Sequence, residues 1–345
     1  MSDIFRTFAG GSGNSPDVNN RKEQRETMVK RLAIVIPAYK GDFIDEAIGS
    51  VARQTCKDFT LYVGNDAGSR EIDKAVEKYK GDIDIVYKRF DENLGGKDLV
   101  AAWTRTLTLM GGEPFFELFS DDDIMEPDCV RRFYEETDKH PDYDVYHFNL
   151  SIINPKSEVR VCREGFPRVI SAREFYDATN VHNKYDIRMP EFIFRTSKFN
   201  EAGGFVSFPH AMRTDNGTVM VVAKDTGIYT IDGPRVRWRS STVHVCNGKA
   251  HGSQAGYLEA SVLYGNWTYE EYFLALPKDV QKKKRWGMLK QFATVDLSIP
   301  MKERIALFRK SKMMKSCQYL ACVIPPLWLL KRIRRVFVKP ERYLD

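Results

Sequence analysis

The chain has 345 residues, of which 43% are hydrophobic and 29% charged, a composition typical of a soluble globular protein with one large domain and an appendage, or with two domains. Residues 281–345 hold 17 Lys/Arg and 4 Asp/Glu, a net charge of +13, which leaves −7 for the first 280 residues out of the +6 in total. A net negative main body argues against nucleic-acid binding, and the lack of a run of about 18 uninterrupted apolar residues argues against a membrane-spanning helix.

The N-terminal segment, residues 1–30, is predicted to be disordered. Residues 9–20 (AGGSGNSPDVNN) are small and polar and cannot bury enough surface to order themselves. No apolar core of a signal peptide is present, so we expect none. The six cysteines form no CxxC pair, and we expect them to be buried thiols in a reducing compartment, which places the protein in the cytoplasm.

Short apolar runs alternate with amphipathic helical patterns over the next hundred residues. The strand-like runs cover residues 32–36, 59–63, 83–87 and 115–119, and the helical patterns cover 44–52, 70–79 and 99–110. This alternation predicts an α/β fold in which helices flank a mostly parallel sheet. Ligands bind at the carboxyl ends of the strands in such sheets, so the loops there are the first candidates for a site.

Three carboxylates, Asp121, Asp122 and Asp123, directly follow the fourth strand-like run. Adjacent carboxylates repel one another, and a divalent cation relieves that repulsion. Mg²⁺ and Mn²⁺ prefer oxygen ligands and commonly take one or two carboxylates together with substrate phosphates. The alternative is an acidic turn that caps the next helix.

Two further loops offer weaker signals. Asp66, in VGNDAGS, could accept hydrogen bonds from a nucleoside, or could form an Asx-turn. The loop at residues 92–97 has paired glycines that permit close backbone approach, and it precedes a helix whose N-terminus, with Lys97, would favour an anion. A plain glycine turn is the alternative for that loop.

The second half of the chain is less regular. Strand candidates lie at residues 145–150, 158–162 and 192–195, and Ser171 with Glu174 forms a possible capping box. From about residue 256 the pattern is helical to the end.

Five segments, in this order, resemble the family 2 glycosyltransferases with the GT-A fold. They are IVIPAYK at 34–40, AIGSVARQT at 47–55, VGNDAGS at 63–69, ENLGG at 92–96 and FSDDDIMEPD at 119–128. The resemblance is clear over residues 31–130, fainter to about 245 and absent beyond. It implies a Rossmann-like GT-A domain over residues 31–250, with a mostly parallel central sheet flanked by helices, and a C-terminal helical extension over residues 251–345.

The resemblance also assigns roles in binding a nucleotide-sugar donor. Pro37, Ala38 and Tyr39 would form the loop against the nucleoside, Asp66 would accept from the N3–H of a pyrimidine, and Asp121 would lie near the ribose. UDP is therefore the favoured nucleotide and dTDP the next. The same resemblance places Asn93, Gly95 and Lys97 at the donor.

Asp122 would be the metal-binding carboxylate of the DXD-type motif, with Asp123 close by, and the ion would be Mn²⁺ or Mg²⁺. The chain departs from the family in having Ser120 at the first place of an Asp-x-Asp-Asp pattern and Lys40 in the first loop. These departures leave the division of labour among the aspartates open. His244 is a further candidate ligand.

An inverting transfer needs a carboxylate that takes the proton of the acceptor hydroxyl. In the family this is an aspartate downstream of a Gly-Gly-Phe turn, which is residues 203–205 here, so the resemblance assigns Asp215 as the base. Thr214 replaces the usual glutamate before it. Asp215 as a helix cap, or Asp225 or Asp232 as the base, are the alternatives.

Arg213 and His210, near the same turn, are candidates for contacts with the donor phosphates or the acceptor. Trp238 is a candidate to stack on a sugar ring.

The tail combines an apolar stretch with basic residues. Residues 313–337 include Tyr319 and Trp328 and end in a cluster of Lys and Arg. This pattern predicts an interfacial helix pair with a basic rim that is drawn to anionic lipid. The family resemblance implies a glycan or a lipid-linked acceptor at the inner face of the cell membrane, in polysaccharide synthesis. A core helix or a dimer contact is the alternative.

Two other function classes remain as rivals. A metal-dependent nucleotidyltransferase would carry a glycine-rich basic signature after the first strand, and PAYKGDF is a poor version of it. A catalytically inactive membrane-bound scaffold would not need the acidic trio and Asp215.

Overall fold

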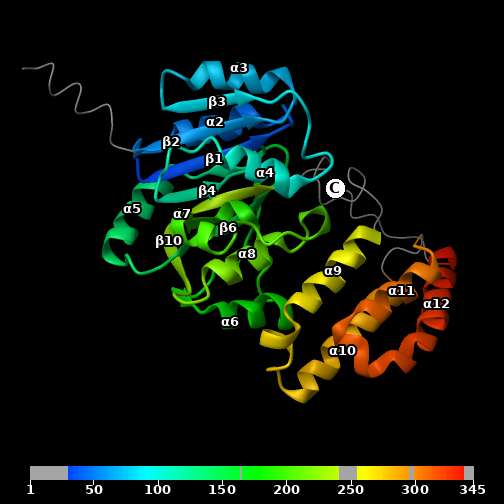
Figure 1. The fold of residues 1–345 in the computed structure, drawn as a ribbon. Helices are drawn as coiled ribbons and strands as arrows, with labels where there is room; N and C mark the ends of the chain where they lie inside the picture. Colours follow the sequence, from blue (N-terminus) through cyan, green and yellow to red (C-terminus); the bar gives the residue numbers. More distant parts are fainter. Residues whose placement is uncertain (1–29, 164, 241–254, 295–298, 338–345) are drawn as a thin grey trace, which may run out of the picture.

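A central sheet covered by helices on both faces is joined to a separate group of helices at the C-terminal end (Figure 1). The computed structural model describes residues 30–163, 165–240, 255–294 and 299–337, and the side chains of Ala255 and of residues 333–337 are not described. The segment predicted to be disordered and the predicted boundary near residue 250 fall outside the described residues, apart from Lys30.

The first half of the sheet is parallel, as predicted. Strands β3, β2, β1 and β4 lie side by side in that order, and each pair is parallel. Their bounds are β1 Leu32–Ala38, β2 Phe59–Asn65, β3 Ile85–Arg89 and β4 Phe115–Leu118. The carboxyl ends of β1, β2 and β4 therefore meet at one edge, where the candidate loops emerge.

The second half continues the sheet in the order β9, β6, β10, β5. Strand β9 is antiparallel to both β4 and β6, whereas β10 runs parallel to β6. The bounds are β5 Ile124–Met125, β6 Val145–Ile153, β7 Val159–Cys162, β8 Val169–Ile170, β9 Phe192–Arg195 and β10 Ile228–Arg239. The sequence pattern does not predict β10, because its pairing with β6 shifts register between Ile231 and Val236, around Gly233-Pro234.

Both faces of the sheet are buried, since alternate residues of β1 enter two different hydrophobic cores. Ile34 and Ile36 join the core with α2, α3 and α5, and Ala33 and Val35 join the core with α6, α8 and α9. The covering helices are α2 Ile44–Ala52, α3 Arg70–Tyr79, α4 Leu99–Leu107, α5 Cys129–Lys139, α6 Ala172–Tyr176, α7 Thr196–Glu201 and α8 Thr214–Val222. The predicted capping box of Ser171 and Glu174 is present at the start of α6.

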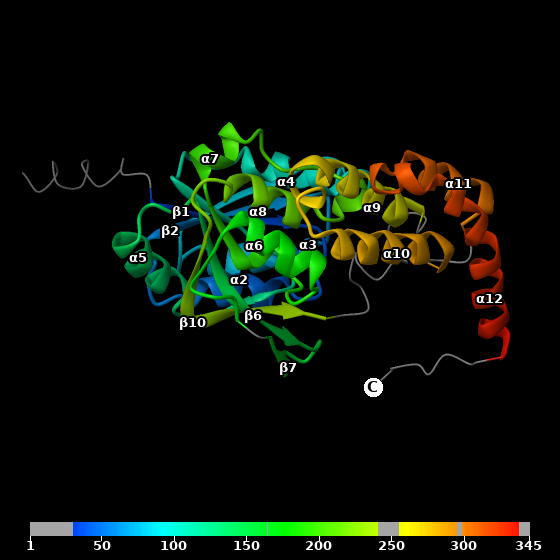
Figure 2. The ribbon, with the colours of Figure 1, turned by 90° about the horizontal axis from the view of Figure 1, so that it is seen from below.

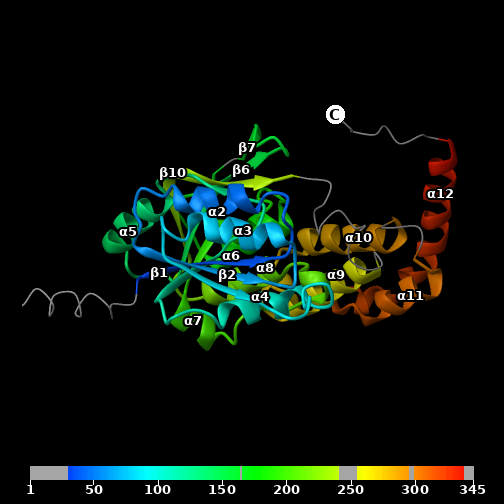
Figure 3. The ribbon, with the colours of Figure 1, turned by 90° about the horizontal axis from the view of Figure 1, so that it is seen from above.

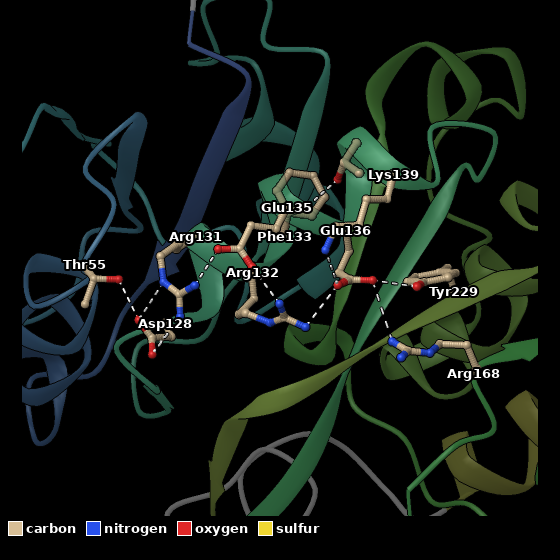
Figure 4. Close-up of polar contacts among 11 residues, drawn as sticks. Thr55, Asp128, Arg131, Arg132, Phe133, Glu135, Glu136, Lys139, Arg168 and Tyr229 are labelled. Carbon is tan, nitrogen blue, oxygen red and sulfur yellow. Dashed lines mark hydrogen bonds and ion pairs between the residues drawn. The ribbon is translucent and has the colours of Figure 1, made fainter.

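Helix α5 is fixed to the sheet by a network of charged side chains (Figure 4). Glu136 is 5% exposed and accepts a hydrogen bond of 2.6 Å from the Tyr229 hydroxyl of β10. The Glu136 carboxylate also lies 3.0 Å from Arg132 and 3.7 Å from both Lys139 and Arg168. Burial opposes its ionisation, but the Tyr229 hydrogen bond and the three cations outweigh burial, so the pKa of Glu136 is lowered.

The C-terminal helices form a group with a core of its own, and α12 lies farthest from the sheet (Figures 2 and 3). The prolines Pro325 and Pro326 fall in the first turn of α12, where they begin a helix rather than interrupt one. The elements are α9 Ala255–Trp267, η5 Tyr269–Phe273, α10 Lys278–Thr294, α11 Met301–Lys310, η6 Lys312–Val323 and α12 Ile324–Phe337. Within the described ranges, no helix has the length and apolar character needed to cross a membrane.

The cysteines in the described part of the chain are free, but the expectation that they are buried is wrong for most of them. Cys129, the first residue of α5, is buried, whereas Cys162 and Cys322 are exposed and Cys56 and Cys317 are half-buried. Cys162 lies on β7, which pairs with β6 and whose residues are all exposed.

Candidate active site

The acidic trio lies at the end of β4, beside the end of β1. One carboxylate oxygen of Asp121, Oδ2, accepts hydrogen bonds from the main-chain N–H groups of Tyr39, at 2.9 Å, and Lys40, at 3.0 Å. The parallel register of β1 and β4 brings these two loops to the same edge of the sheet. Asp121 thus joins the predicted nucleoside loop to the predicted metal motif.

The other two aspartates are more deeply placed. Asp122 is 5% exposed and Asp123 is fully buried. Asp123 Oδ1 accepts a hydrogen bond of 2.8 Å from the main-chain N–H of Arg239, and Asp123 Oδ2 is buried with no hydrogen-bond partner in the described structure. The burial of Asp123 makes Asp122 and Asp121 the carboxylates of the trio that a ligand can reach.

The side chain of Arg239 fixes the acidic loop in place. Its guanidinium is fully buried and donates to the carbonyl oxygen of Asp122 at 2.7 Å, to Ser157 Oγ at 3.0 Å and to Glu46 Oε2 at 2.9 Å. It therefore ties the acidic loop to α2 and to the β6–β7 hairpin, and its planar fork suits several acceptors at once. The sequence pattern does not reveal this role, because 116 positions separate Arg239 from Asp123.

All three carboxyl groups of the trio resist ionisation. Burial is the largest cause for each, and it raises the pKa of Asp121, Asp122 and Asp123. The charge of Asp122 raises the pKa of its two neighbours further, while Lys40 and Arg239 act in the opposite direction on Asp122. The loop thus holds three carboxyl groups whose ionised forms have too few cations nearby to balance them.

This donor set fits a hard divalent cation that is completed by substrate. In the ranges that the structure describes, no three His, Cys, Asp or Glu side chains are arranged to hold a metal by themselves. Mg²⁺ and similar ions are commonly held by one or two carboxylates plus phosphate oxygens and water. The orphaned Asp123 Oδ2 and the raised pKa of Asp122 agree with such a partly built site.

Asp66, at the end of β2, holds the glycine loop. Its Oδ1 accepts from Leu94 N at 3.0 Å, its Oδ2 accepts from Gly95 N at 2.7 Å, and Arg105 of α4 pairs with the same carboxylate. A carboxylate offers about four lone-pair sites, so these three donors leave one for a ligand. The predicted residues Asp66 and Gly95 are therefore in direct contact.

The rest of that loop is less engaged. Asn93 Oδ1 accepts from Gly96 N at 2.6 Å, which closes the turn. Lys97 is exposed, and its Nζ lies 3.7 Å from Glu92 Oε2. Helix α4 begins after Lys97, and Asp98 caps it by accepting from Ala101 N.

A cavity of about 450 Å³ lies beside these loops and is a candidate nucleotide cleft. Its walls come from the two loops that follow β1 and β2 and include Tyr39, Lys40, Gly68 and Ser69. The loops touch closely, because a Cβ on Gly68 would lie 2.1 Å from the Tyr39 carbonyl oxygen. Pro37 and Ala38 are the last residues of β1 and pair with β2, so they form the floor next to this cleft.

Asp215 lies in the first turn of α8, and its main-chain context is strained. Three non-glycine residues just before it, His210, Ala211 and Arg213, have φ between 55° and 66°. Such left-handed conformations cost free energy and cluster at functional sites. The residue that caps α8 is Arg213, so Asp215 does not serve as the helix cap.

The Asp215 carboxyl is poised to take a proton near neutral pH. Burial raises its pKa to about 6, although the Asn216 N–H, which donates at 2.8 Å, and the charges of Arg213 and Arg188 oppose this rise. The charge of Glu191 raises the pKa a little further. A base is most effective when its pKa lies near the working pH.

The C-terminal helices pack against the strained segment before Asp215. The His210 ring stacks on Tyr257 of α9 with centroids 6.0 Å apart, and a Cβ on Gly256 would lie 2.0 Å from His210 Nε2. The Arg213 guanidinium lies 5.8 Å from the ring centroid of Tyr264. Helix α9 thus supports the segment that carries the candidate base.

The remaining candidates are covered by another side chain, exposed away from the acidic trio in sequence, or outside the described residues. Arg188 covers a face of Trp238 at 4.4 Å from the ring centroid. Asp225 is exposed, and Asp232 lies 3.2 Å from Arg168 at the irregular part of β10. His244 lies outside the described residues.

Two comparisons bear on this arrangement. The model of the family described as Glycosyl transferase family 2 matches residues 33–202. Among solved structures, the fold is similar to that of S. aureus TarS 1–349, with 14% identity, a TM-score of 0.54, and 90% of this chain and 93% of that chain covered. The same protein in complex with UDP-GlcNAc gives 13% identity, a TM-score of 0.53, and coverage of 88% and 92%. The predicted GT-A fold, with its mostly parallel sheet and helical C-terminal region, is confirmed.

Proposed function

Residues 33–202 of this chain are a glycosyl transferase family 2 domain and the chain is a glycosyltransferase, and from that premise we propose that it is an inverting, metal-assisted enzyme. It moves a sugar from a nucleotide-diphosphate sugar to a hydroxyl group of a glycan or a lipid-linked acceptor. UDP-sugars are the favoured donors and dTDP-sugars the next.

The observation that carries this proposal is the acidic trio at the ends of β1 and β4. Its carboxyl groups have raised pKa values, and Asp121 accepts hydrogen bonds from two main-chain N–H groups of the predicted nucleoside loop. In our proposal, Asp122 holds Mn²⁺ or Mg²⁺ and Asp123 supports that site from the interior. The ion would stabilise, as a Lewis acid, the charge on the departing diphosphate.

Asp215 is the proposed base. The acceptor oxygen forms a bond to the anomeric carbon while the bond from that carbon to the diphosphate oxygen breaks, and Asp215 receives the hydroxyl proton. The nucleoside diphosphate leaves with the electron pair of the broken bond. Arg213 lies beside Asp215 in the chain and supplies positive charge for the donor phosphates or the acceptor.

The nucleotide preference rests on Asp66 and on one relative. The one lone-pair site that remains on the Asp66 carboxylate could accept the N3–H of uracil or thymine. Pro37, Ala38, Tyr39, Asn93, Gly95 and Lys97 stay in the proposal as surroundings of the donor. A structure of S. aureus TarS 1–349, which shares the fold, holds UDP-GlcNAc, and this supports testing UDP-sugars first.

Turnover of a donor panel tests this function. UDP-, dTDP- and GDP-sugars are incubated with Mn²⁺ or Mg²⁺, with and without a mixed glycan acceptor, and release of the nucleoside diphosphate is measured. We expect metal-dependent release from a pyrimidine donor in the wild type and its loss in Asp122→Ala. Absence of release from every donor would favour the scaffold hypothesis.

We also propose that the enzyme is cytoplasmic and binds the inner face of the membrane through its tail, in the synthesis of a surface polysaccharide. Tyr319, Leu329 and Leu330 are 73%, 52% and 60% exposed, and Lys331 and Arg332 follow directly. Exposed apolar side chains beside cations suit a surface of anionic lipid.

Liposome flotation tests the membrane proposal. Deletion of the tail is a poor variant, because Phe308, Met314 and Ile324 belong to the core of the C-terminal helices. We therefore compare wild type with the double variant Leu329→Glu, Leu330→Glu on vesicles of phosphatidylcholine with 30% phosphatidylserine. Flotation of the wild type that the variant loses supports the proposal, and equal flotation contradicts it.

A further inference from the structure

A second cavity, of about 400 Å³, lies on the other half of the sheet from the nucleotide cleft. It is enclosed by the β6–β7 hairpin and the segment that leads from β7 to β9. Its lining includes His147, Asn149, Val161, Cys162, Tyr185 and Glu191. This volume falls within the usual range for small-molecule sites. The proposed transfer reaction assigns no role to this cavity.

The inner wall carries a buried imidazole nitrogen that makes no hydrogen bond to the residues that the structure describes. His147 is 1% exposed; its Nδ1 lies 3.3 Å from Thr230 Oγ1, whereas its Nε2 makes no hydrogen bond and lies 3.6 Å from Glu191 Oε2. Asn149, which is half-buried on the same strand, accepts a hydrogen bond of 3.1 Å at its Oδ1 from Phe166 N. Buried polar groups are normally hydrogen-bonded, so a wall of this kind indicates a polar ligand.

The charges around the cavity are balanced, which indicates that the ligand is neutral. Of the lining residues, Arg163 and Lys184 are cationic and Asp186 and Glu191 are anionic. Arg163 Nη2 pairs with Asp186 Oδ2 at 2.9 Å. An anionic ligand would meet Glu191 in the wall, and a cationic one would meet Arg163 and Lys184.

Apolar atoms complete the wall. Val161 and Ile152, on the paired strands β7 and β6, and the rings of Phe166 and Tyr185 line the same cavity. Hydroxyl groups on the edge of a ring together with C–H groups on its faces are the chemistry of a sugar. We propose that this cavity binds a neutral pyranose unit of the acceptor glycan.

This proposal rests on the proposed function, and one residue connects the two sites. Glu191 lines the cavity, and its Oε1 accepts from Arg188 N at 2.7 Å. The charges of Glu191 and Arg188 both act on the pKa of Asp215, in opposite directions. Glu191, a residue of the cavity wall, therefore lies within electrostatic reach of the base.

The rim offers a matched pair of variants. Cys162 lines the cavity and is exposed, so Cys162→Trp should fill the entrance without removing any packed ring. Val159, on the same strand, is 47% exposed and lies outside the lining, so Val159→Trp is the control with the same added side chain. His147→Phe keeps the stacking on Phe166, whose ring centroid lies 4.2 Å away, and removes the polar atoms.

The experiment is saturation-transfer NMR on the full chain with the methyl pyranosides of glucose, galactose, mannose, rhamnose, N-acetylglucosamine and N-acetylgalactosamine, and with glycerol 1-phosphate as an anionic probe. We expect at least one neutral glycoside to bind the wild type. Its affinity should fall at least tenfold in Cys162→Trp and in His147→Phe, and stay unchanged in Val159→Trp.

Three results would overturn the proposal: no glycoside binds, the Cys162→Trp variant binds like the wild type, or glycerol 1-phosphate binds more tightly than every glycoside. UDP titration of the same variants separates this proposal from the proposed function. If UDP binds with metal and no glycoside does, the cavity proposal alone fails. If UDP does not bind the wild type under any condition, the donor site itself is misassigned.

Discussion

Two groups of buried carboxylates lie on opposite parts of this protein, and their surroundings differ. Glu136 on α5 has three cations and the Tyr229 hydroxyl around it, and its pKa is lowered (Figure 4). Asp122 and Asp123, at the end of β4, are 5% and 0% exposed, and their pKa values are raised. The protein thus supplies enough positive charge to stabilise the ionised carboxylate at one place, and too little at the other.

This difference distinguishes carboxylates that stabilise the fold from carboxylates that bind a ligand or take part in the reaction. A carboxylate with its partners in the protein stabilises the fold, whereas carboxyl groups that burial makes hard to ionise cost folding free energy in their charged form unless something outside the protein binds them. Asp215, with a pKa raised to about 6, belongs with the second group. The comparison therefore predicts that loss of Asp215 or Asp122 reduces activity, and that loss of Glu136 reduces stability.

The largest expected effect is on the base. Asp215→Asn keeps the size of the side chain and removes its ability to take a proton, so the rate of sugar transfer should fall roughly 10²–10⁴-fold. Binding of UDP with Mn²⁺ should be unchanged, as measured by calorimetry. A variant that transfers sugar at more than a tenth of the wild-type rate would remove Asp215 from the mechanism.

Glu136→Gln tests whether the balanced carboxylate on α5 stabilises the fold. It keeps a partner for Tyr229 and removes the charge that faces three cations, so the free energy of unfolding should fall by about 1–3 kcal/mol. Urea unfolding at pH 7 measures this, and activity below the transition should match the wild type. Glu136 has a lowered pKa in the folded state, so its contribution is present above its ordinary pKa, near 4.5, and disappears as the pH falls through the lower folded value. The difference between variant and wild type should therefore vanish in acid; a difference that persists there would contradict the network.

The pH profile of sugar transfer should show the ionisation of Asp215. A base with a pKa of about 6 is ionised above that pH, so kcat/KM should rise about tenfold per pH unit below 6 and level off above it. In Asp215→Asn the residual rate should lack this limb. A limb that survives in the variant would assign the titration to another group.

The smallest expected effect concerns the support of the base by α9. In Gly256→Ala the new Cβ would lie 2.0 Å from His210 Nε2, so the His210 ring must move from its place on Tyr257, and we expect transfer to slow several-fold with UDP binding retained. Gly287→Ala, in α10, is the control, because nothing lies within 4 Å of its Cβ. Equal rates in both variants would show that α9 does not position the base.

Local patterns predicted the donor half of the fold well. The apolar runs at residues 32–36 and 59–63 are β1 and β2, and helix α3 covers the predicted residues 70–79. These elements are contiguous in sequence, and their hydrophobic periods are regular, so each is visible without knowledge of its partners. The position of the acidic trio after β4 follows from the same regularity.

Features that depend on distant contacts were not predictable. The register shift in β10 conceals its pattern, and Arg239 acquires its role only when β10 returns beside the acidic loop. The engagement of Asp66 by the glycine loop and Arg105 likewise arises from chain segments that are 28 and 39 residues away. No local spacing encodes such contacts, and the same is true of the support of His210 by α9.

The most direct test of the central claim is calorimetric titration of UDP into the wild type, Asp122→Ala and Glu136→Gln, each with and without Mn²⁺. The account predicts metal-dependent binding to the wild type and to Glu136→Gln, and loss of at least 100-fold in affinity in Asp122→Ala. Metal-independent binding, or equal affinity in Asp122→Ala, would contradict the claim that the unbalanced carboxylates form the donor site.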